Sequence, residues 1–184
     1  SVTPLQMATG YAVFANGGYR VNPWLVRRIT DHRGKVLVET LPPLPTEAMR
    51  AIDARNAFIM DRLLNEIARS GTAARAQATL KRPDIYGKTG TTNDSIDTWF
   101  NGFHPSLVAV VWMGYDNPRP LGDRETGGSM SLPVWINFMQ TALKGVPEVA
   151  PVAPPGVVNV GGEWYYEEYA AGGGVTSLGL PGEA

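Results

Sequence analysis

Residues 84–115 read DIYGKTGTTNDSIDTWFNGFHPSLVAVVWMGY and carry the clearest structural pattern in the chain. It contains three segments of strand-like composition, 84–90, 98–103 and 107–115, rich in β-branched and aromatic side chains. The short turn HPS joins the last two segments as a hairpin. The last segment is apolar at both odd and even positions. We therefore expect it to be covered on both faces, as a central strand of an antiparallel sheet.

Helical patterns precede these strands. The first covers residues 3–16 and opens with Thr3, Pro4 and Gln6, the arrangement of a capping box. The second covers residues 53–69, with an aspartate as its cap. Its apolar positions recur at helical spacing and predict a buried face. That face would be formed by Ala57, Met60, Leu64 and Ile67.

Further elements are indicated by turn and cap residues. SGT ends the second helical pattern, and its Thr72 is interpreted as the start of a short helix through residue 76. Residues 24–39 are predicted to form two strands around a turn. A last helix is expected after Ser131, its predicted cap, with Pro133 in the first turn. Its predicted apolar face comprises Val134, Trp135, Phe138, Met139 and Leu143.

Helices packed against an antiparallel sheet define an α+β fold. The chain has 184 residues, 43% of them hydrophobic, which is enough for one domain with a buried core. We predict that this domain covers residues 1–147. Residues 148–184 are rich in proline and glycine and are predicted to be a tail, in which only residues 156–169 could form strands.

The composition argues against several classes of protein. The formal net charge is −1 and no stretch is dominated by lysine and arginine, which argues against nucleic-acid binding. Because the chain has no cysteine, disulfides and thiolate metal sites are excluded. Two separated histidines make a poor metal site, so neither a metal nor a cofactor is predicted. The longest apolar run, 107–113, is too short to cross a membrane, so we expect membrane attachment only through a segment outside this chain.

Two common catalytic patterns are not supported. Gly87-Lys88-Thr89 matches the end of a phosphate-binding loop, but Arg82 stands where that motif needs its first glycine. His32 and His104 each lie in a predicted turn and are expected to be exposed, so a Ser-His-Asp site is not favoured. The chain also lacks the GxSxG elbow of serine hydrolases.

The remaining candidate is Lys88-Thr89-Gly90-Thr91. A lysine at a strand end can hold an anionic group or take part in the proton network of a nucleophile. Thr89 and Thr91 alternate, so their hydroxyls share one face and can both bind a carboxylate. Gly90 lets a ligand lie against the backbone, and an edge strand here could pair with an extended peptide. The alternative is a solvated lysine in a glycine-rich turn.

These residues do not stand alone. The segments SVTPLQMATGYAVFANGGYRVNP, SGTAARA, GKTGTTNDSIDTWFNGF, LVAVVWMGYDNP and ETGGSMSLPVW follow one another in that order. The series resembles the C-terminal half of the transpeptidase domain of class A, bifunctional penicillin-binding proteins. The likeness covers residues 1 to about 147. The surroundings of the KTG motif, GKTGTTND followed by a WF hairpin and GYDNP, are what point to class A.

The resemblance implies a β-lactamase/transpeptidase-like fold, incomplete in this chain, and a serine D,D-transpeptidase. Such enzymes cross-link peptidoglycan stem peptides through an acyl-enzyme, and β-lactam antibiotics acylate the same serine. They are anchored in the bacterial cytoplasmic membrane and act on its outer side, and class A members also carry a glycosyltransferase. By family role, Lys88 and Thr91 would be catalytic, the latter through an oxyanion-binding N–H. Thr89, Gly90 and Thr91 would bind substrate.

Two of the three family motifs are missing. No serine stands three residues before any of the four lysines, so there is no SxxK, and no SxN occurs. Tyr115-Asp116-Asn117 imitates a variant of SxN, but it follows KTG, whereas the family's second motif precedes it. We therefore expect an inactive fragment whose partner is the upstream part of the same domain, carrying SxxK and SxN. The alternative is a non-catalytic module of the same fold that binds peptide or cell-wall polymer.

Overall fold

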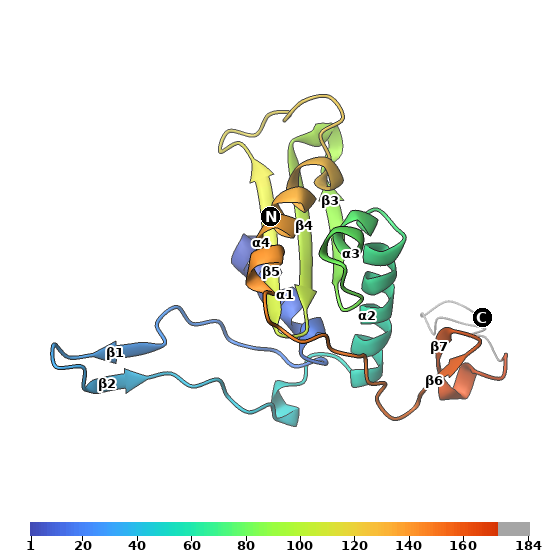
Figure 1. Ribbon diagram of the computed structural model, residues 1–184, viewed down its shortest axis with the longest axis horizontal. Coiled ribbons are helices and arrows are strands. Elements are labelled where there is room, and N and C mark those ends of the chain that lie inside the picture. Colours follow the sequence, from blue (N-terminus) through green and yellow to red (C-terminus); the bar gives the residue numbers. More distant parts are fainter. Residues whose placement is uncertain (173–184) are drawn as a thin grey trace, which may run out of the picture.

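The computed structural model describes residues 1–172 and is built around a three-stranded antiparallel sheet (Figure 1). Its strands are β3 (Tyr86–Thr91), β4 (Asp97–His104) and β5 (Leu107–Gly114), in the order β3-β4-β5. Each of them corresponds to one of the three strand-like segments within residues 84–115. The α+β fold class predicted from the sequence is therefore confirmed.

The position predicted for the last strand is wrong. Within the described residues β4 is the central strand of the sheet, and β5 lies at one edge. Helices cover both faces of β5, which explains its continuous apolar composition. Val108 packs in a cluster with residues of α1 (Pro4–Ala15), whereas Ala109 packs in the cluster formed by α4 (Leu132–Ala142). Within residues 1–172, the apolar residues on both faces of β5 thus reflect two covering helices and not a central place in the sheet.

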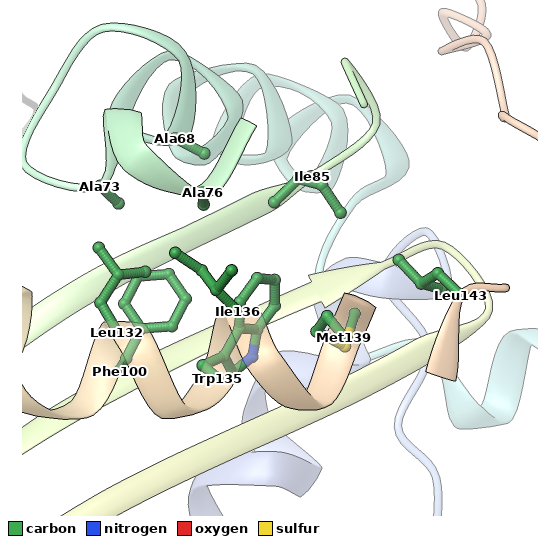
Figure 2. Close-up of a cluster of buried hydrophobic side chains, with 10 residues drawn as sticks. All are labelled: Ala68, Ala73, Ala76, Ile85, Phe100, Leu132, Trp135, Ile136, Met139 and Leu143. Atoms are coloured by element: carbon green, nitrogen blue, oxygen red, sulfur yellow. The ribbon is translucent and has the colours of Figure 1, made fainter. Parts of the chain in front are cut away.

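The main core lies between the sheet and α4. Trp135 and Phe100 form an edge-to-face pair with ring centroids 4.9 Å apart, and both side chains are fully buried. Figure 2 shows Leu132, Ile136 and Met139 from the same helix around this pair. Small side chains complete the cluster: Ala68 of α2 (Ala54–Arg69), Ala76 of α3 (Ala74–Leu80) and Ala73, the residue just before α3.

A second cluster lies on the opposite face of the sheet, beneath α1. Tyr86 and Phe103, which pair across β3 and β4, stack with centroids 4.8 Å apart. Tyr11 and Phe14 of α1 pack against them. The capping box predicted for this helix is confirmed, because the Thr3 hydroxyl accepts from the N–H of Gln6 and the Gln6 side chain accepts from the N–H of Thr3.

Several details of the predicted helices differ from the structure. Ser131 occupies the predicted N-cap position of α4, but its side chain makes no capping hydrogen bond, and α4 is preceded by a π-helical turn, η3 (Gly127–Ser131), whose cap is Thr126. Ser131 is buried instead and its hydroxyl lies 2.8 Å from that of Thr98. Three side chains placed on predicted apolar faces are largely exposed: Met60, Val134 and Phe138. Helical spacing predicted these helices correctly, but the apolar face predicted for each helix is wider than the face that is buried.

The remaining elements extend from this body. The hairpin predicted within residues 24–39 is confirmed as β1 (Arg28–Thr30) and β2 (Val36–Glu39), and it projects away from the sheet (Figure 1). Its two strands are exposed throughout. Residues 1–172 also contain three short 3-10 turns, η1 (Glu47–Met49), η2 (Asn93–Ser95) and η4 (Glu167–Tyr169). No helix within residues 1–172 is both long and apolar enough to cross a membrane.

The strands predicted in the tail are confirmed as the hairpin β6 (Val157–Val160) and β7 (Glu163–Tyr166). This hairpin packs on α2, where Trp164 meets Phe58 edge to face with centroids 4.9 Å apart. Arg55 and Glu168 form an ion pair of 2.9 Å across the same contact. The division into a domain over 1–147 and a tail over 148–184 stays a prediction, and residues 173–184 of that tail lie outside the described residues.

A buried ionic network links residues 147–149, which follow α4, to the segment just before β3 and the end of β4. Asp84 is 2% exposed and accepts from Arg82, from the N–H of Val149 and from the ring of His104. Arg82 also donates to the carbonyl of Pro147. Burial alone would raise the pKa of Asp84, but the hydrogen bonds from Arg82 and Val149 hold that pKa below its usual value.

The pKa of Asp61, a carboxylate on α2, is shifted in the opposite direction to that of Asp84. Asp61 lines a cavity of about 300 Å³ together with Phe58, Tyr86 and residues 149–152. Its Oδ1 is buried and finds no hydrogen-bond partner within residues 1–172. Burial raises the pKa of Asp61 to about 7, although the charge of Arg62 acts in the other direction. The folded state therefore favours the neutral carboxyl.

This setting predicts a pH-dependent stability. The unfolded chain releases the Asp61 proton at about pH 4, whereas the folded chain keeps it until about pH 7. We expect the free energy of unfolding of the intact protein to fall as the pH rises through this interval. Asp61→Asn should flatten that decline, as followed by urea unfolding at several pH values. The exposed Asp116→Asn is the matched control, and a decline that persists unchanged in Asp61→Asn would contradict the assignment.

Candidate functional site

The Lys88-Thr89-Gly90-Thr91 segment forms the last four residues of β3, so the predicted strand is confirmed. In its register with β4, Thr89 lies opposite Phe100 and Lys88 lies opposite Asn101. Residues directly opposite in an antiparallel pair share a face of the sheet. Thr89 and Thr91 therefore lie on the face covered by η3 and α4, and Lys88 lies on the face covered by α1. The expectation that the two threonines share a face is confirmed.

The backbone of this segment faces an open edge. Within the described residues β3 pairs only with β4. Thr92, just after β3, donates its N–H to the carbonyl of Asp97 at 3.1 Å, that is, toward the β4 side. Because successive strand residues point their polar backbone groups to alternate edges, those of Thr91 and Thr89 point away from β4. The N–H of Thr91 is thus directed to the edge where an extended ligand could lie.

Lys88 reaches this edge from the other face. Its side chain is exposed, and its Nζ donates to the carbonyl of Thr89 at 2.9 Å and to the hydroxyl of Thr89 at 3.3 Å. An ammonium group has three donors and no acceptor, so Lys88 can bind a further acceptor at the same time. The sequence alternative of a solvated lysine in a turn does not describe this position, because Lys88 lies within a paired strand.

The hydroxyl of Thr91 is held from the opposite side. It accepts from the N–H of Gly127 at 3.0 Å, at the first residue of η3. A threonine hydroxyl has one donor and two acceptor positions. Because the bonds from Lys88 and Gly127 use only an acceptor position on Thr89 and Thr91, each of these hydroxyls keeps a proton that it can donate. Two hydroxyl donors and one cation therefore converge beside the open edge of β3.

Gly127 makes this arrangement possible through its lack of a side chain. A Cβ at this position would lie 2.4 Å from the carbonyl oxygen of Trp99 and 2.5 Å from that of Gly90. The backbone of η3 therefore lies directly on the β3–β4 ladder. Neither Gly127 nor Thr126 is among the site residues predicted from the sequence. The sequence does contain a pattern that could have identified them, a threonine followed by two glycines at the start of a helical segment. The prediction misses this pattern because it places the start of that helix at Ser131.

His104 is not the exposed turn residue that the sequence suggested. It is fully buried, with Nε2 at 3.0 Å from Asp84 and Nδ1 at 2.8 Å from the hydroxyl of Ser106. The order of atoms imitates a Ser-His-Asp relay. However, the N–H of Ser106 donates to the same Nδ1 and Arg82 lies 3.1 Å from Nε2. The ring is enclosed by structural contacts, so we assign it to the network that anchors residues 147–149.

The fold and the KTG strand are those expected of a penicillin-binding transpeptidase domain, and comparison with known families tests this assignment. The family described as the penicillin-binding protein transpeptidase domain matches residues 1–140. The chain belongs to this family. The resemblance to class A penicillin-binding proteins expected from the sequence is confirmed by its relatives.

Three relatives illustrate the relationship. Penicillin-binding protein 1A of Neisseria flavescens is 47% identical over 167 residues, which cover 90% of this chain and 21% of that protein. The protein of the same name from Pseudomonas aeruginosa is 39% identical over 206 residues, covering 87% of this chain and 25% of that protein. The crystal structure of penicillin-binding protein 1A from Haemophilus influenzae superposes with a TM-score of 0.78 at 34% identity, covering 85% of this chain and 28% of that chain. The chain thus spans between a fifth and a third of the length of these relatives.

The contact between η3 and the sheet gives a sharp test. Gly127→Ala should destabilise the protein by roughly 1–3 kcal/mol, because the new methyl group would overlap two backbone oxygens of the β3–β4 ladder. Gly128→Ala is the matched control, since a Cβ there makes only contacts of 3.7 Å, and it should change stability by less than about 1 kcal/mol. Thermal unfolding of both variants provides the measurement. Equal melting temperatures for the two would refute the close approach.

Proposed function

We propose that this chain is the KTG-bearing part of a serine D,D-transpeptidase that cross-links peptidoglycan stem peptides. The observation that carries the proposal is the convergence of Lys88 with the hydroxyls of Thr89 and Thr91 at the open edge of β3. A peptide that ends in a carboxylate fits this edge. Its backbone can pair with the strand, while its carboxylate accepts from the two hydroxyls and is attracted by the ammonium.

The proposed chemistry is a two-step acyl transfer. A serine hydroxyl attacks a carbonyl of the donor stem peptide, the terminal residue leaves as an amine, and an acyl-enzyme is formed. An amino group of a second stem peptide then attacks the acyl-enzyme and releases the serine. In both steps the N–H of Thr91 would donate to the oxygen on which negative charge develops. Its direction toward the open edge supports this role.

The nucleophile must come from outside this sequence. The chain has no SxxK and no SxN, so we place the serine on the upstream part of the same domain. Lys88 would complete the proton network that links the two missing motifs. β-Lactam antibiotics, which carry an anionic group beside a reactive carbonyl, would occupy the same edge. The intact protein would be anchored in the cytoplasmic membrane, facing outward, and would also carry a glycosyltransferase.

Acylation by a fluorescent penicillin tests this proposal. The chain alone should remain unlabelled, and labelling should appear when the upstream part of the domain is supplied, with a serine in that part as the modified residue. Mass spectrometry of the labelled peptide identifies the site. A reconstituted protein that stays unlabelled would favour the alternative reading, a non-catalytic module that binds peptide or cell-wall polymer.

A second experiment tests the role of the lysine. In the intact protein, Lys88→Ala should slow penicillin acylation on the order of 100-fold or more, because a catalytic proton network loses one member. The melting temperature should change little, since the Lys88 side chain is exposed and lies outside both cores. Lys144→Ala, in an exposed position after α4, is the matched control and should acylate at the normal rate. Unchanged acylation in Lys88→Ala would refute the assigned role.

A further inference from the structure

The hydroxyl of Thr89 has a second polar neighbour, which lies outside the KTG strand. Thr72, in the turn between α2 and α3, places its Oγ1 3.0 Å from the Oγ1 of Thr89. Either hydroxyl can be the donor in this contact. Thr72 is 17 residues from Thr89 in the sequence, and the patterns around it indicate only the start of a short helix. Tertiary packing therefore adds a third hydroxyl to the two of the strand.

The backbone around Thr72 is firmly held. On one side, Gly71 lies so close to α2 that a Cβ there would be 2.9 Å from the Cα of Ile67. On the other side, Ala73 is fully buried in the main core, and its N–H donates to the carbonyl of Ile67 at 3.2 Å. The carbonyl of Thr72 also faces η3, at 3.7 Å from the position of a Cβ on Gly128. Thr72 thus belongs to a rigid turn that borders the site.

The hydrogen-bond capacity of Thr89 shows what this neighbour can do. Its hydroxyl has one proton and two acceptor positions, and Lys88 uses one of these positions. If Thr72 donates to the second position, the proton of Thr89 is free to bind an anion. If Thr72 accepts, that proton is occupied. An acceptor-only ligand such as a carboxylate selects the first arrangement, in which Thr72 donates to Thr89 and Thr89 donates to the ligand.

We propose that Thr72 is a positioning residue that orients the Thr89 hydroxyl as a donor to the carboxylate of the substrate or antibiotic. This inference rests on the proposed function of the KTG strand. Thr72 touches Thr89 and acts through it, so it contributes to recognition of the anionic group and not to the chemistry of the serine. Chains of hydrogen bonds polarise one another, so the donor from Thr72 also strengthens the bond from Thr89 to the ligand.

The test compares two forms of one antibiotic on the intact protein. The acylation rate constant at low concentration is measured for benzylpenicillin and for its methyl ester, in which the carboxylate is masked. Thr72→Val, which keeps the shape and removes the hydroxyl, should lower the preference for the free acid over the ester about tenfold. Thr72→Ser, which restores a hydroxyl, should recover most of this preference. Thr46→Val, at an exposed position without a side-chain hydrogen bond to a helix, is the matched control and should behave as wild type.

The outcomes separate this inference from the function on which it rests. A merely structural role for Thr72 would lower both rates equally and leave their ratio intact, which would overturn the inference. An unchanged preference in Thr72→Val, or no recovery in Thr72→Ser, would overturn it as well. In each of these cases the wild-type protein is acylated and the proposed function stands. A wild-type protein that neither compound acylates would overturn the proposed function and this inference together.

Discussion

The pairing register of β3 on β4 is the constraint on which the site depends. A slip by one residue would exchange the faces of Lys88 and Thr89 and separate the two threonine hydroxyls from η3. The register is held by aromatic side chains on both faces of the sheet. Phe100 is buried against Trp135 on one face, and Phe103 stacks on its cross-strand neighbour on the other. Moving either ring to the wrong face would leave it without its cluster.

The site combines a strand edge with two turns that contribute nothing to the sheet. The turn of Gly127 donates to one threonine hydroxyl, and the turn of Thr72 contacts the other. Both turns are placed by the main core, because α4 follows the first and the buried Ala73 follows the second. The packing of small residues from α2 and α3 against α4 therefore sets distances within the site (Figure 2). Stability of that core and orientation of the hydroxyls are physically linked.

Sequence patterns were most informative where the determining interactions are local. The capping box at Thr3 and the strand around Lys88 depend on neighbours within a few residues, and both were predicted correctly. Errors arose where distant segments cover an element. The apolar strand β5 was placed centrally although helices cover it at the sheet edge. His104 was expected in solvent, because nothing near it in the sequence reveals that Arg82 and Asp84 enclose its ring.

The α+β class, the KTG strand and the family can be read from the amino-acid sequence, because alternation, capping residues and ordered motifs are properties of short segments. The hydrogen-bond partners of the functional groups are visible only in the folded chain. Thr72 meets Thr89 at a separation of 17 positions in the sequence, and Gly127 meets Thr91 at a separation of 36. Such contacts follow from how helices pack on the sheet, and no local pattern encodes them. The functional groups of the KTG strand can be predicted from its sequence, whereas the orientation of its hydroxyls depends on the fold around it.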